Sequence, residues 1–141
     1  MNTHGGRHII KKIKTFGEFL NRKRTQHEMS LRKFAEQTDI SPVYMCNMEK
    51  NRNPAPSEEI LIKMVKLLLL SDEEAAMFYD LAAASKNTPT VSQDLAKYIM
   101  AKDLARVALR TAKDVDATDE EWQQFISMLE AKRKKIQEDR S

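Results

Sequence analysis

The chain has 141 residues and a mass of 16.3 kDa, which fits one compact domain, or one small domain with an appendage. Its 41% hydrophobic residues, 32% charged residues and single cysteine exclude a collagen, a disulfide scaffold and a long disordered chain. No apolar run approaches the roughly 20 residues of a membrane helix, and the start MNTHGGRHIIKK has no hydrophobic signal region. We therefore expect a cytoplasmic protein without a membrane span.

Charge is unevenly distributed, although the formal net charge is only +3. Residues 1–57 contain 11 Lys or Arg and 5 Asp or Glu, residues 58–131 contain 8 and 14, and residues 132–141 contain 5 and 2. A basic first part favours an electronegative partner there, most obviously nucleic acid. Charge alone is weak evidence, because a well-solvated domain can carry the same excess.

The fold is expected to be all-α, because only three Gly and four Pro are available for the turns of β proteins. In the first predicted helix, from about residue 15 to residue 27, Phe16 and Leu20 share one face. Later helix starts are indicated by capping residues, in the order Ser30, Ser41, Ser57, Ser71, Ser92 and Thr118. Ser71 and Thr118 each stand three residues before a Glu, which is the pattern of a capping box.

Two short predicted helices between residues 30 and 50 are joined by a turn of about three residues, which is the layout of a helix-turn-helix. Residues 15–70 resemble the Cro/C1-type helix-turn-helix domain of phage repressors and the xenobiotic-response-element family. The resemblance lies in FGEFLNRKR, SLRKFAEQTDISPVYMCNMEKNRNP and SEEILIKMVKLLLLS. It is most specific at the small, turn, core and acidic positions Ala35, Asp39, Ile40, Met45, Met48 and Glu49. It implies a lambda-repressor-like bundle of five helices that binds double-stranded DNA.

The third predicted helix is the candidate reader of bases. A helix about 10 to 12 Å across fits the major groove, and the spacing of Met45 and Met48 turns that side of the helix toward the core. The residues left to face base edges are Ser41, Pro42, Val43, Tyr44, Cys46 and Asn47. Among them, Asn47 can bond adenine N6 and N7, and Val43 can contact a thymine methyl.

The resemblance implies two further sets of residues. The first set is expected near DNA phosphates and comprises Ser30, Arg32, Lys33 and Arg52. Lys50, at the end of the reader helix, is added to it. The second set is an ion pair between Arg24, at the end of the first helix, and Glu49, at the end of the third. The sequence departs from the family at three positions. It has Leu31 where the family usually has a Gln that supports a phosphate contact, and Asp39 and Asn51 where the family usually has Gly. Asp and Asn can adopt positive φ at modest cost.

Other chemistry has little support in the sequence. The three histidines and Cys46 lack metal-ligand spacing, so we expect no metal and no cofactor. Redox sensing by Cys46 is conceivable near a helix N-terminus, but a lone cysteine at a small-residue position is ordinary. The sequence has no Gly-rich phosphate loop and no recognisable Ser-His-Asp arrangement. We therefore expect no enzymatic activity.

The predicted organisation has four parts. Residues 1–14 form a flexible basic arm, 15–85 a DNA-binding domain with its reading unit at 31–50, 86–137 a C-terminal helical region, and 138–141 a tail. The boundary is placed at the linker-like KNTPT, residues 86–90, and the charged end KRKKIQEDRS is expected to fray. The C-terminal region contains an apolar stripe of Trp122, Phe125, Ile126 and Leu129. This stripe could pack on residues 92–113 of the same chain, form a dimer interface or bind a protein partner.

These observations predict a transcriptional regulator of bacterial, phage or mobile-element origin, most simply a repressor that binds a pseudo-palindromic operator as a homodimer. The alternative is an antitoxin or a phage inhibitor protein. Its C-terminal region would bind a protein partner, and its helix-turn-helix would regulate its own promoter.

Overall fold

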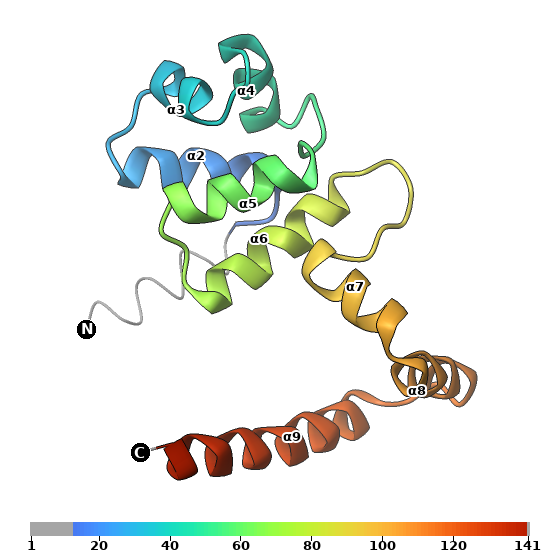
Figure 1. Cartoon of the computed structure of the whole chain (residues 1–141). Coiled ribbons are helices and arrows are strands. Elements are labelled where there is room, and N and C mark those ends of the chain that lie inside the picture. The colour runs from blue at the N-terminus through green and yellow to red at the C-terminus, as the bar shows by residue number, and fades with distance from the viewer. Residues whose placement is uncertain (1–12, 141) are drawn as a thin grey trace. The chain divides into compact units, whose positions relative to one another are not determined.

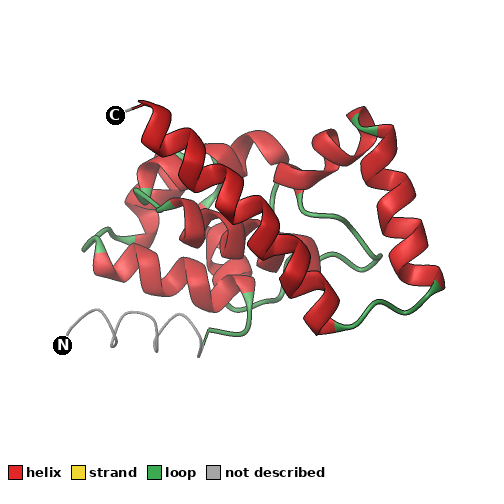
Figure 2. Ribbon diagram, turned by 90° about the horizontal axis from the view of Figure 1, so that it is seen from below, coloured by secondary structure: helices red, strands yellow, loops and turns green. Residues whose placement is uncertain are grey.

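The computed structural model describes residues 13–140, and within this range it contains helices and loops but no strand (Figures 1 and 2). The expected all-α class is therefore confirmed for this part of the chain. The helices are α2 (Phe16–Gln26), α3 (Leu31–Gln37), α4 (Pro42–Glu49), α5 (Glu58–Leu67), α6 (Asp72–Ala84), α7 (Gln93–Ala101), α8 (Asp103–Asp114) and α9 (Asp119–Arg140). Residues 1–12, most of the predicted basic arm, lie outside the described residues.

Local capping chemistry fixes where the helices begin. Six of them, α3 to α7 and α9, each begin one residue after the capping residue predicted from the sequence. The Ser30 and Ser41 hydroxyls accept hydrogen bonds from N–H groups of the first turn, whereas Ser57 makes no side-chain cap bond. Both predicted capping boxes are present, at Ser71 with Glu74 and at Thr118 with Glu121. Each satisfies N–H groups that the helix itself leaves unpaired.

The chain divides into two compact units, the first up to Lys97 and the second from Tyr98 onward. The first unit therefore includes the segment 86–90, where the linker-like composition predicts a domain boundary. Polar contacts hold this stretch to the first unit, because the ammonium of Lys86 donates to the carbonyl oxygen of Ala55 at 2.8 Å. A few residues later, the Ser92 hydroxyl donates to the carboxylate of Asp80 on α6.

The first unit contains the hydrophobic core, built from α2 to α6 in the five-helix order that the resemblance implies. Its largest fully buried side chains are Phe19, Phe34, Phe78, Leu20, Met45, Met48, Met64 and Leu68. The Phe78 ring joins α6 to α2, with centroids 5.2 Å from Phe16 and 5.5 Å from Phe19. Each such burial contributes about 1.5–3 kcal/mol to folding. This core is the platform on which α3 and α4 rest (Figure 1).

The second unit has a different character, because none of the described residues of α8 and α9 is buried. A positive φ of 52° at Asp116 ends α8, and Thr118 then caps α9. In the structure, α9 continues through most of the charged end, to Arg140. Lys, Arg, Glu and Gln are good helix formers, and Glu130 stands four residues before Lys134 on one face. None of the helices in the described range combines the length and the hydrophobicity that a membrane span needs.

Candidate nucleic-acid interface

The turn between α3 and α4 has the close packing that a helix-turn-helix requires. Ala35 is fully buried, and its carbonyl oxygen accepts a hydrogen bond from the Ile40 N–H at 2.9 Å. The buried Thr38 hydroxyl donates to the carbonyl oxygen of Phe34 at 2.8 Å, which satisfies the end of α3. Asp39 adopts a φ of 58°, so the predicted substitute for a turn glycine takes the left-handed conformation. The α3 and α4 helices consequently lie side by side above α2 (Figure 1).

The two sides of α4 differ as the sequence predicts. Met45 and Met48 are completely buried, whereas Val43 is 72% exposed. The remaining residues predicted to read bases are exposed at Ser41, Pro42 and Tyr44 and half-buried at Cys46 and Asn47. Within the described chain, no hydrogen bond occupies the Asn47 side-chain amide, although its backbone oxygen accepts one from the Arg52 N–H at 2.8 Å. The outward side of α4 is thus available to a partner.

The predicted ion pair between α2 and α4 is present and largely buried. The Nε and Nη2 atoms of Arg24 donate to the two carboxylate oxygens of Glu49 at 2.6 and 3.0 Å. The side chains are only 13% and 6% exposed. The Nη1 of Arg24 donates to the carbonyl oxygen of Met29, and the Asn21 amide donates to Glu49 at 3.0 Å. The hydrogen bond to Glu49 raises the pKa of Arg24 against the opposing effect of burial, which keeps the guanidinium charged.

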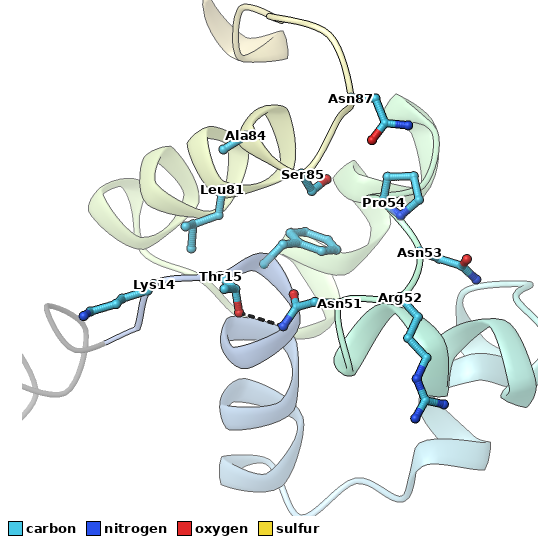
Figure 3. A pocket seen from close by; sticks show the side chains of 11 residues that line it. Lys14, Thr15, Asn51, Arg52, Asn53, Pro54, Leu81, Ala84, Ser85 and Asn87 are labelled. Carbon is cyan, nitrogen blue, oxygen red and sulfur yellow. Dashed lines mark hydrogen bonds between the residues drawn. The ribbon is translucent and has the colours of Figure 1, made fainter.

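A second attachment at the same end of α4 was not expected from the sequence. The Asn51 side chain accepts a hydrogen bond from the Gly17 N–H at 3.0 Å. It also donates one to the Thr15 hydroxyl at 3.0 Å (Figure 3). A Cβ on Gly17 would lie 2.5 Å from the carbonyl oxygens of Met48 and Glu49. Glycine at position 17 therefore lets the end of α4 approach the backbone of α2. The available signal was a glycine inside a predicted helix, where it costs about 1 kcal/mol relative to alanine.

The residues predicted to contact phosphates lie at two places on the helix-turn-helix. Ser30, Arg32 and Lys33 are exposed at the start of α3, and Lys50 and Arg52 are exposed just after α4. The Ser30 hydroxyl is already engaged as the N-cap, accepting the Lys33 N–H at 3.1 Å. Leu31 is half-buried against the core, so it offers no replacement for the phosphate contact that the resembling family makes there.

Three cations of the first unit have a carboxylate partner, whereas the others among its described residues, including those predicted to contact phosphates, have none. Lys23 pairs with Glu74, Arg24 with Glu49, and Lys63 with Asp39. In contrast, no ion pair among the described residues involves the four cations predicted to contact phosphates, Arg32, Lys33, Lys50 and Arg52. Their positive charge is therefore not neutralised by neighbouring carboxylates, which is the electrostatic condition for attracting a polyanion.

An open cavity of about 360 Å³ lies behind the loop that follows α4 (Figure 3). Its lining combines Asn51 and Pro54 of this loop with Leu81 and Ser85 of the α6 end. The Ser85 hydroxyl accepts the Ala55 N–H at 2.8 Å, so hydrogen bonds hold the loop at both ends. None of the lining residues is a carboxylate, a histidine or a cysteine, and the cavity therefore offers no acid–base pair. Arg52 also belongs to the lining, and its side chain points away from Ser85 (Figure 3).

The predicted apolar stripe of the C-terminal region lies on the surface of its own unit. Trp122 is half-buried and packs edge to face with Phe125 at 6.1 Å between centroids. Phe125, Ile126 and Leu129 remain 46%, 44% and 46% exposed. An open groove of about 380 Å³ between α8 and α9 is lined by Trp122 and Phe125, together with the small residues of α8. Packing on α8 therefore accounts for the start of the stripe and not for the rest.

The described residues contain no group of three or more His, Cys, Asp or Glu side chains that could hold a metal ion. Cys46 is a free, half-buried thiol. His27 is occupied structurally, because its Nε2–H donates to the carbonyl oxygen of Leu68 at the end of α5 at 2.8 Å. The other two histidines, His4 and His8, lie outside the described residues.

Comparison with known proteins adds little. A scan against protein-family models found no match, and a search of curated proteins found none either. Among solved structures, the chain is similar to the SinR protein/SinI protein complex, with 16% sequence identity over 85% of this chain and 99% of that chain, and a TM-score of 0.40. A similarity this low carries no argument about function, which has to be inferred from the residues and their geometry.

Proposed function

We propose that this chain is a sequence-specific DNA-binding transcriptional regulator whose α4 helix reads bases in the major groove. The observation that supports this most directly is the division of α4. One side is buried through Met45 and Met48, and the other presents Val43, Tyr44 and Asn47. A helix held in this way on a rigid platform matches the requirement for inserting side chains between the walls of the groove.

In the proposed mechanism, one set of residues positions the domain on the DNA and another set recognises the base sequence. Arg32 and Lys33 on α3, with Lys50 and Arg52 after α4, hold phosphates and set the orientation of the domain without regard to sequence. Asn47 then recognises adenine through its amide, and Val43 recognises thymine through its methyl groups. The chain acts as a homodimer on a pseudo-palindrome, with reader helices about 34 Å apart on one face of the duplex. No catalytic step is proposed.

Binding anisotropy on an operator and a scrambled duplex, across a salt series, tests this division of roles. The operator is obtained by selection from random duplexes. We expect Arg52→Ala to weaken binding to both duplexes about equally and to lower the magnitude of the salt slope by about one. Asn47→Ala should cost about 1–3 kcal/mol on the operator alone. Lys66→Ala, which removes an exposed cation from α5, is the matched control and should leave both affinities unchanged.

Two results would contradict the proposal. One is that no selected duplex binds better than scrambled DNA. The other is that Asn47→Ala weakens both duplexes equally while retaining the wild-type melting temperature. Either would remove α4 from base reading, whatever the effect of the phosphate contacts.

A second candidate function is an antitoxin or phage inhibitor, favoured by the exposed apolar residues of α8 and α9. In this role the C-terminal region binds a different protein, and DNA binding only regulates the promoter of the chain itself. A stable complex of the full chain with one heterologous protein, lost on replacing both Phe125 and Leu129 by Ser, would favour it. The same replacements would leave the DNA affinity of a single half-site unchanged.

A further inference from the structure

Helix α9 presents an apolar seam that its own unit covers only at the start, where Trp122 is half-buried beside α8. Along the helix, Trp122, Phe125, Leu129 and Ile136 recur at spacings of three, four and seven, the pattern of a helix that packs lengthwise on another. Phe125, Leu129 and Ile136 are 46%, 46% and 44% exposed. Position 132 continues the pattern but holds Lys132, whose long stem can cover apolar surface while its ammonium reaches water.

Charges flank this seam in an ordered way. On one flank, positions spaced by seven are Asp119, Ile126 and Arg133, and on the other flank they are Glu121, Met128 and Lys135. Each flank therefore has an acid near the helix start, an apolar residue in the middle and a base toward the end. The acid and base of one flank are 14 residues apart, which is about 21 Å along the helix axis.

We infer that α9 pairs with α9 of a second copy of this chain, antiparallel and in one register centred on residues 126–128. The inference deepens the homodimer of the proposed function and rests on it. A twofold axis that crosses the two helices sets each flank against the same flank of the other copy. Asp119 then faces Arg133 of the second copy, and Glu121 faces its Lys135. Ile126 and Met128 each meet their own counterparts at the centre.

Most of the seam fits this register, with Ile136 lying opposite Thr118 of the second copy. Phe125 lies opposite Leu129 of the second copy, and Trp122 lies opposite the stem of its Lys132, where a cation can contact an aromatic ring. A parallel pair would instead place Lys132 against Lys132 within the seam, which brings like charges together. It would also leave the four flanking charges without the partners that the antiparallel pair supplies. Charge complementarity therefore selects both the occupant and its direction.

Sedimentation of the full chain tests the charge pairing, with controls that change the same charges on the far side of α9. Asp119→Lys and Arg133→Glu each create two like-charge contacts per dimer and should weaken dimerisation about tenfold. The matched controls are Glu120→Lys, in the same first turn, and Lys134→Glu, one residue further along. Both controls should dimerise like the wild type. An equimolar mixture of Asp119→Lys and Arg133→Glu should recover the wild-type affinity.

Thiol crosslinking tests the direction. Ile126→Cys should crosslink efficiently with a short bifunctional maleimide, because the two copies meet at this position. Asp119→Cys alone should not, since its two copies lie about 21 Å apart, but a mixture of Asp119→Cys with Arg133→Cys should. The parent chain, which contains only Cys46, sets the background.

The inference is overturned by a chain that stays monomeric at 100 micromolar, by controls that dimerise as poorly as the flank variants, or by an uncrosslinked Ile126→Cys dimer. A monomer would assign the seam to the rest of the same chain or to a different protein. Neither experiment contains DNA, so its failure leaves base reading by α4 untouched. Failure to find an operator would equally leave the helix pairing in place.

Discussion

Removing the Glu49 carboxylate should destabilise the first unit more than removing any exposed carboxylate. Glu49→Ala deletes the acceptor of three hydrogen bonds, two from Arg24 and one from Asn21. The Arg24 guanidinium then stays in a site where only 13% of its side chain is exposed, with the carbonyl oxygen of Met29 as its remaining partner. The cost comes from this stranded charge rather than from the lost attraction.

The expected magnitude follows from that burial. Breaking a buried pair by removing one partner costs about 3–5 kcal/mol, whereas an exposed pair contributes about 0–1 kcal/mol. Because Arg24 is not completely enclosed, we expect the lower end, about 3 kcal/mol. For a unit of this size, that corresponds to a loss of more than about 10 °C in melting temperature.

Urea unfolding followed by circular dichroism at 222 nm measures the difference. The matched control is Glu36→Ala, which removes an exposed carboxylate of α3. A double variant, Arg24→Met with Glu49→Leu, should recover most of the loss, since apolar residues of similar volume replace buried pairs well. Equal unfolding free energies for Glu49→Ala and Glu36→Ala would refute this account of the pair.

Three further outcomes follow from the first unit. Gly17→Ala should destabilise it by about 1–3 kcal/mol in urea unfolding despite the better helix propensity of alanine, because the added Cβ meets backbone oxygens at 2.5 Å; unchanged stability would contradict the close approach. Burial opposes the ionisation of Glu74, but the hydrogen bond and charge of Lys23 help to outweigh it and lower its pKa. The ionised Glu74 carboxylate contributes its whole stabilisation above the ordinary pKa of 4.5, and this contribution disappears as the pH falls through the lowered pKa. The free energy of unfolding of Glu74→Gln should therefore decrease less than that of the wild type between pH 5 and 3. Leu69 is 77% exposed and has a φ of 51°. Leu69→Gly should therefore raise the free energy of unfolding by about 0.5–1 kcal/mol, whereas Ile62→Gly within α5 should lower it by about 1 kcal/mol.

The starts of six helices were predictable because in most of them the cause is local. A serine or threonine that precedes a helical apolar pattern is visible in the sequence, and α3 to α7 and α9 each begin one residue after such a residue. The hydroxyl accepts a first-turn N–H in α3, α4, α6 and α9 but not in α5. The positive φ at Asp39 and Asn51 was predictable for a similar reason, because few residue types tolerate it. The burial of Met45 and Met48 followed from their helical spacing.

Contacts between distant residues were predictable only where the resemblance supplied them. It implied the pair of Arg24 with Glu49 but neither the Asn21 amide that joins it nor the Asn51 contacts to α2. The bond from Gly17 to Asn51 spans 34 residues, and no local pattern reports on a separation of that length. The extension of the first unit beyond residues 86–90 was missed likewise, since linker-like composition does not exclude contacts such as that of Lys86 with Ala55.

The attachments of α4 explain how so short a helix can be held well enough to read bases. Its eight residues are too few for a stable helix in isolation, and it buries only Met45 and Met48. Contacts to Arg24, Asn21 and Gly17, directly or through Asn51, hold its end, while the Ser41 cap and the Ala35 carbonyl hold its start. Asn47 lies between these fixed ends with its amide unoccupied. Because bidentate base recognition fails when the side chain is displaced by about 1 Å, a loosened α2 contact should reduce discrimination between operator and scrambled DNA before it abolishes DNA binding.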